Sequence, residues 1–209
     1  MSNNQFLRLS TGYNGYPELR KDNRYYVDKT EFIKTVINYD CKVLLLTRPR
    51  RFGKSVFMST LNAFLKIDSN KPGDISFQNK IFKDTKIFQD KEFCNKYMGQ
   101  FPVIFVSLKD VNGDNFEGAY ERFASTVYKL AIKFKYLLNS NKLDEFDKEE
   151  LSKLLNRSYL EQLKNQNSLK DSLSILASAL YKEYEKYPIL IIDECDVPLA
   201  RASFHDSIN

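Results

Sequence analysis

The sequence has few of the residues that build metal centres and disulfide frameworks. Its 209 residues include three cysteines, Cys41, Cys94 and Cys195, and one histidine, His205. Because the cysteines are odd in number, far apart and form no Cys-x-x-Cys pair, we expect neither a zinc site nor a set of disulfides. Unpaired thiols are typical of a reducing compartment, so the sequence predicts a cytoplasmic protein.

Long apolar runs and a secretory leader are also missing. No segment approaches the roughly 20 apolar residues that cross a bilayer, and the N-terminus lacks the basic and then apolar pattern of a signal peptide. We therefore expect no membrane partner. Hydrophobic residues make up 43% of the chain and charged residues 28%. These values are ordinary for a globular protein of one domain or two small ones.

One stretch carries the strongest functional signal. The apolar run at residues 43–46 has the length of a buried strand and is too short for a helix. A loop with Pro49 follows, and Gly53-Lys54-Ser55 then opens a segment with apolar residues at helical spacing. A strand, a loop and a helix in this order are the context of a phosphate-binding loop.

The residue types in this stretch suit a polyphosphate, which needs many donors and little steric bulk. Unpaired backbone N–H groups at a helix N-terminus attract an anion, and Gly53 permits its close approach. Lys54 is expected on the β- and γ-phosphates, and Ser55 on a magnesium ion. The predicted nucleotide-binding residues are Arg48, Pro49, Arg50, Arg51, Phe52, Gly53, Lys54, Ser55 and Val56.

The stretch departs from the general pattern Gly-x-x-x-x-Gly-Lys-Ser/Thr at its first position, which is Arg48. Pro49 follows and has no N–H to donate. On this stretch alone, a basic surface turn remains the alternative.

Further apolar patterns predict the rest of the fold. Residues 101–106 and 189–192 are predicted as buried strands, with helices at 115–138, 142–156 and 168–184. Strands separated by helices indicate an α/β protein with a parallel sheet flanked by helices, of the P-loop NTPase type. Residues 1–24 are predicted as an irregular arm, and 25–209 as a partial P-loop domain. Asp28 and Glu31 predict a capping box before a helix at 32–37.

Two acidic residues follow the strand predicted at 189–192. Asp193 and Glu194 lie just past its carboxyl end, where parallel sheets bind ligands. Asp193 is expected to hold magnesium, and Glu194 to orient or deprotonate the water that attacks the γ-phosphate. The same pattern also describes an ordinary core strand with a polar end, but together with Lys54 and Ser55 it favours a nucleotide site.

Three segments, taken together, resemble the bacterial AAA-ATPase-like family. They are residues 25–30 (Tyr-Tyr-Val-Asp-Lys-Thr), residues 48–55 (Arg-Pro-Arg-Arg-Phe-Gly-Lys-Ser) and residues 191–199 (Ile-Ile-Asp-Glu-Cys-Asp-Val-Pro-Leu). The resemblance implies that an arginine at position 48 is usual, and that the nucleotide is ATP. Members often carry a C-terminal nuclease-like domain of the PD-(D/E)XK type. Cys195 stands where the family often has an aromatic residue.

The resemblance also implies parts that are missing after residue 199. P-loop ATPases with Glu beside Asp usually have a strand between the phosphate-loop strand and the Asp-Glu strand. That strand comes later in sequence and carries a residue that senses the γ-phosphate. We therefore expect a sheet that is incomplete at its C-terminal side, to be completed by a further region or a protein partner. Turnover of ATP in this chain is expected to be weak or absent.

Two alternative functions also remain compatible with the sequence. Arg48, Arg50 and Arg51 form the one dense basic cluster in a chain of net charge +5, so the loop could contact nucleic-acid backbone. The chain could also be a structural remnant without either activity. Nucleic-acid binding should weaken steeply with salt, whereas nucleotide binding should need magnesium and Lys54.

Overall fold

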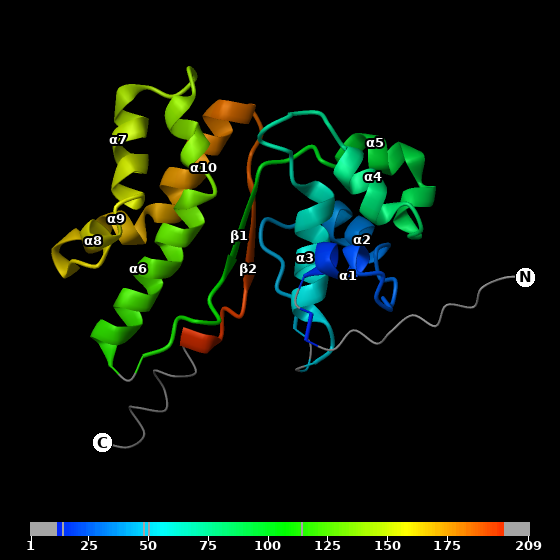
Figure 1. The fold of residues 1–209 in the computed structure, drawn as a ribbon, viewed down its shortest axis with the longest axis horizontal. Helices are drawn as coiled ribbons and strands as arrows, with labels where there is room; N and C mark the ends of the chain where they lie inside the picture. Colours follow the sequence, from blue (N-terminus) through cyan, green and yellow to red (C-terminus); the bar gives the residue numbers. More distant parts are fainter. Residues whose placement is uncertain (1–11, 14, 48, 50, 114, 199–209) are drawn as a thin grey trace, which may run out of the picture. The chain divides into compact units, whose positions relative to one another are not determined.

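The structure is a computed structural model that describes residues 12–198 except 14, 48, 50 and 114 (Figure 1). The chain divides into two compact units, with the boundary between Phe101 and Pro102. In the part described, the first unit is helical and the second holds a parallel β-sheet, so the predicted α/β class is confirmed at this level.

The first unit contains short helices around the longer α3. Their bounds are α1 (Tyr16–Lys21), α2 (Phe32–Asn38), α3 (Lys54–Leu65), α4 (Ser76–Phe82), the 3₁₀ turn η1 (Ile87–Gln89) and α5 (Lys91–Tyr97). Phe64 of α3 lies at the centre of an aromatic core. Its ring centroid is 5.4 Å from that of Phe82 and 6.1 Å from that of Phe93.

Helix α1 corrects the prediction that residues 1–24 form an irregular arm. Residues 1–11 and 14 lie outside the described residues, but residues 16–21 are helical and contact α3. Tyr16 is buried, its N–H donates to Ser59 Oγ at 3.0 Å, and its hydroxyl donates to the Ile81 carbonyl at 2.9 Å. Burial raises the pKa of the Tyr16 phenol. Pro17 does not break the helix because it lies in the first turn, where no N–H is needed.

The second unit carries two parallel strands with helices packed on them. The elements are β1 (Val103–Ser107), α6 (Phe116–Ile132), η2 (Lys135–Asn139), α7 (Glu145–Leu154), α8 (Arg157–Leu160), η3 (Leu163–Asn165), α9 (Gln166–Lys170), α10 (Ser172–Tyr184) and β2 (Ile189–Asp193). Ile104 and Val106 of β1 belong to one buried cluster with residues of α6, α7 and α10. Successive side chains of a strand point to opposite faces of the sheet, so Ile104 and Val106 lie on the same face. That face packs against the helices.

The register of the strands brings their carboxyl ends together. Val103 is opposite Ile189 and Ser107 is opposite Asp193, and both predicted strands and their parallel order are confirmed. The helix predicted at 168–184 is in fact two helices, α9 and α10, and no side chain caps the start of α10. The helix predicted at 115–138 ends at Ile132, after which η2 follows.

Candidate functional site

The start of α3 has the geometry of an anion-binding helix N-terminus. Gly53 is the residue before the helix and has φ +78°. The first helical hydrogen bond runs from the Phe57 N–H to the Gly53 carbonyl at 2.9 Å. The N–H groups of Lys54, Ser55 and Val56 therefore precede the helical ladder and have no partner within it. The first turn of α3 contains no acidic residue.

The backbone of the loop explains why a glycine stands at position 53. A Cβ added to Gly53 would meet no atom within 4 Å, so the requirement comes from φ alone. Arg51 also adopts a positive φ of 68°, and Phe52 between them is exposed. Pro49 is exposed too. Arg48 and Arg50 lie outside the described residues.

The apolar run before the loop does not form the buried strand predicted for it. Val43 is 85% exposed and Leu45 72% exposed, and residues 43–47 are not in a strand. The prediction is wrong because a strand needs a hydrogen-bonded neighbour. Within the described chain, β1 and β2 pair with each other and neither pairs with residues 43–47. Leu46 is the half-buried member of the run.

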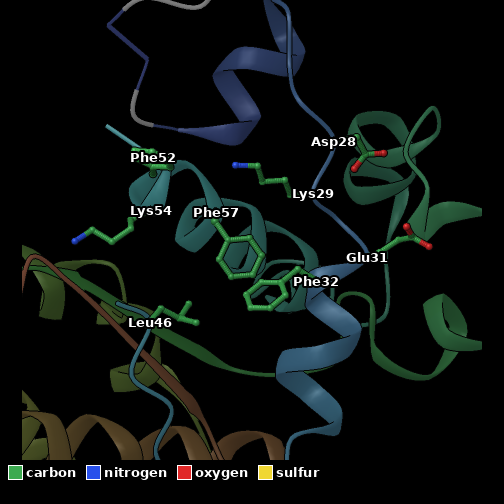
Figure 2. A pocket seen from close by; sticks show the side chains of 9 residues that line it. Asp28, Lys29, Glu31, Phe32, Leu46, Phe52, Lys54 and Phe57 are labelled. Atoms are coloured by element: carbon green, nitrogen blue, oxygen red, sulfur yellow. The ribbon is translucent and has the colours of Figure 1, made fainter. Parts of the chain in front are cut away.

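A cavity of about 350 Å³ lies beside the start of α3 (Figure 2). It is lined by Asp28, Lys29, Glu31, Phe32, Leu46, Phe52, Gly53, Lys54 and Phe57. The rings of Phe32 and Phe57 lie next to each other with their centroids 5.1 Å apart. Three of the predicted binding residues, Phe52, Gly53 and Lys54, thus border a cavity together with the segment that precedes α2.

Hydrogen bonds fix the segment that precedes α2. Asp28 Oδ1 accepts from the Thr30 N–H at 2.8 Å and from the Thr30 hydroxyl at 2.7 Å. Asp28 Oδ2 accepts from the Lys86 N–H at 2.7 Å, and Thr30 Oγ1 accepts from the Ile87 N–H at 3.2 Å. The predicted capping box is therefore wrong, since Asp28 holds the chain near η1 and no side chain caps α2. We call these bonds the Asp28–Thr30 clamp.

Removing the Thr30 hydroxyl should destabilise the first unit. Thr30 is buried, and Thr30→Val keeps its shape but leaves the Ile87 N–H without an acceptor. A buried donor without a partner costs about 1–3 kcal/mol. Urea unfolding should show a loss of this size. Thr35→Val, at an exposed position of α2, should leave the midpoint nearly unchanged, and equal losses would contradict the role of the clamp.

The predicted acidic residues lie at the carboxyl end of the sheet in the second unit. Asp193 ends β2, is largely buried, and its carbonyl accepts from the Leu108 N–H at 2.9 Å. Its Oδ1 accepts from the Glu194 N–H at 3.1 Å. Glu194 has φ +56°, a conformation that a glutamate rarely adopts, and Cys195 next to it is exposed. The strand therefore ends in a sharp turn at the two carboxylates.

Comparison with known proteins adds one finding to this geometry. A family model described as Predicted AAA-ATPase matches residues 10–209. The chain belongs to the predicted AAA-ATPase family. Neither the curated proteins nor the solved structures contained a match to it.

The predicted AAA-ATPase match covers both predicted motifs. Gly53, Lys54 and Ser55 lie in the first unit, and Asp193 and Glu194 in the second. Among the residues that the structure places, no three His, Cys, Asp or Glu side chains gather as a metal site would require. None of the helices in this same part combines the length and the apolar character needed to cross a bilayer.

The sequence does not reveal that two phenylalanines of this predicted AAA-ATPase belong to the candidate site. Phe32 lies in the helix predicted at 32–37 and Phe57 in the helical segment that follows Ser55, and helical spacing gives no sign that they line a cavity. Lys29 lies between the two residues of the Asp28–Thr30 clamp. The Asp-x-Thr spacing is itself a turn signal that could have marked this segment as fixed.

Proposed function

We propose that the chain is a P-loop-type domain that binds ATP together with Mg²⁺ and hydrolyses it at most slowly. The observation that carries this proposal is the start of α3. A lysine is its first residue, a left-handed glycine precedes it, and the first turn has no acidic residue. Positive charge at this end opposes the helix dipole, so the arrangement is unfavourable by itself and becomes favourable with a bound polyphosphate.

The side chains have distinct roles in this proposal. The N–H groups of residues 54–56 and the Lys54 ammonium bind the phosphates, and the half-buried Ser55 and the Asp193 carboxylate hold the metal ion. Mg²⁺, when bound, neutralises phosphate charge and orients the terminal phosphate. Glu194 orients and deprotonates the attacking water. Both motifs then act as parts of one ATPase domain.

Glu194→Gln should separate binding from hydrolysis. The amide keeps the size of the side chain but is no base, so the slow release of phosphate should fall to the uncatalysed rate, while Mg²⁺-dependent ATP binding stays within a few-fold of the parent chain. Phosphate release and equilibrium binding would be measured on the same samples.

A matched control is Glu185→Gln, which changes an exposed carboxylate just after α10. It should alter neither quantity. Equal turnover in Glu194→Gln and the parent chain would contradict the role proposed for Glu194. Failure of the parent chain to bind ATP would contradict the proposed function as a whole.

A further inference from the structure

The cavity beside α3 has two kinds of wall. Phe32, Phe57 and Leu46 supply apolar surface and are all half-buried. Lys29 and Lys54 supply positive charge, and Gly53 and Phe52 border the same space. Asp28 and Glu31 also line the cavity, and in Figure 2 their carboxylates lie on the side away from the two ammonium groups. The volume of about 350 Å³ falls at the lower end of the roughly 300–1,000 Å³ range of small-molecule sites. Such a cavity suits a ligand with a flat apolar part and an anionic part.

Lys29 approaches the start of α3 from outside the phosphate loop. In Figure 2 its side chain extends from the segment before α2 toward the first turn of α3, while Lys54 leaves that turn in another direction. Lys29 is exposed and forms no ion pair with any residue that the structure places. Lys54 begins the helix and Lys29 points toward the same positive end, so an anionic ligand would be attracted there.

The backbone on both sides of Lys29 is held in place. Asp28 and Thr30 bond to each other and to the N–H groups of Lys86 and Ile87. The Asp28–Thr30 clamp therefore fixes where the Lys29 side chain begins, and only the flexible side chain itself has to be ordered by a ligand. A preorganised backbone lowers the entropy lost on binding.

Resting on the proposed function, we infer that the segment 28–32 forms the second half of the nucleotide site. Lys29 is a second cation on the polyphosphate, reaching it from the side opposite the loop. The aromatic base of the same nucleoside triphosphate packs against Phe57 and Phe32. Lys29 is thus a binding residue, and the Asp28–Thr30 clamp positions it.

Two ligands distinguish the phosphate-binding half of this site from the base-binding half. ATP, measured with Mg²⁺, has a polyphosphate and a base, whereas inorganic tripolyphosphate with Mg²⁺ has the polyphosphate alone. Binding of each would be measured by calorimetry on the full chain. Lys29→Met should weaken both ligands by about tenfold or more, since it removes a charge-assisted contact. Phe57→Leu should weaken ATP and leave tripolyphosphate unchanged.

The control is Lys83→Met, which makes the same charge change at an exposed position that does not line the cavity. It should leave both affinities unchanged. If both ligands bind in a Lys54-dependent way and Lys29→Met binds them as the parent chain does, the inference is overturned while the proposed function stands. If Lys54→Ala also binds them like the parent chain, the proposed function fails and this inference fails with it.

Discussion

Adding Mg²⁺ and ATP should raise the melting temperature of the parent chain and leave that of Lys54→Ala unchanged. A ligand that binds only the folded state at about 100 times its dissociation constant adds about 2.7 kcal/mol of stability. For a chain of this size each kcal/mol corresponds to roughly 2–4 °C. Lys54 is the first residue of α3 and borders the cavity, so its ammonium is expected to supply much of the binding energy.

The matched control for this experiment is Lys71→Ala, which removes a lysine from an exposed turn of the same unit. It should keep the full shift. Equal shifts in Lys54→Ala and the parent chain would place the nucleotide elsewhere. If nothing shifts, binding of single-stranded nucleic acid should be measured against salt concentration, because phosphate-backbone contacts weaken steeply as salt rises.

The largest loss of stability is expected from Phe64→Ala. Phe64 is fully buried between the rings of Phe82 and Phe93, and truncation of such a side chain costs about 3–5 kcal/mol. That is a large share of the roughly 5–15 kcal/mol that stabilises a typical domain. Because Phe64 lies on the helix that begins with Lys54, ATP binding should weaken as well.

Hydrogen exchange during urea unfolding would locate the effect. Amides of α3 and α4 should lose protection in Phe64→Ala at lower urea than in the parent chain, while those of α6 and α10 should be little changed. Phe77→Ala is the control, since Phe77 on α4 is 52% exposed and its truncation should cost well under half as much. Similar costs for both variants would contradict the aromatic core around Phe64.

The two strands of the sheet were predictable because each is a short apolar run that also has a neighbouring strand. Residues 103–107 and 189–193 are short apolar runs that find each other as parallel neighbours, so local composition was enough to locate them. Residues 43–46 have the same composition but no strand beside them in the described chain. A strand forms only beside a hydrogen-bonded neighbour, and the composition of one segment cannot show whether that neighbour is present.

The site was predictable only where its chemistry lies in consecutive residues. The Gly53-Lys54-Ser55 order identified the start of α3, and the four residues before Asp193 identified its strand. The Asp28–Thr30 clamp depends on Lys86 and Ile87, which are more than 50 residues away in sequence. Helix α1 escaped prediction because Tyr16 and Leu19 alone bury its short apolar face. Tertiary contacts, which local patterns do not encode, decide both cases.

The exposed run at residues 43–45 has a consequence for how the chain behaves in concentrated solution. Its residues are apolar, and none of their main-chain groups bonds to another described residue. An uncovered segment of this kind is a template on which a strand of another molecule can add, with apolar side chains to hold it. Self-association should therefore grow with protein concentration, and a charge introduced at Val43 or Leu45 should keep the chain in solution without touching the cavity.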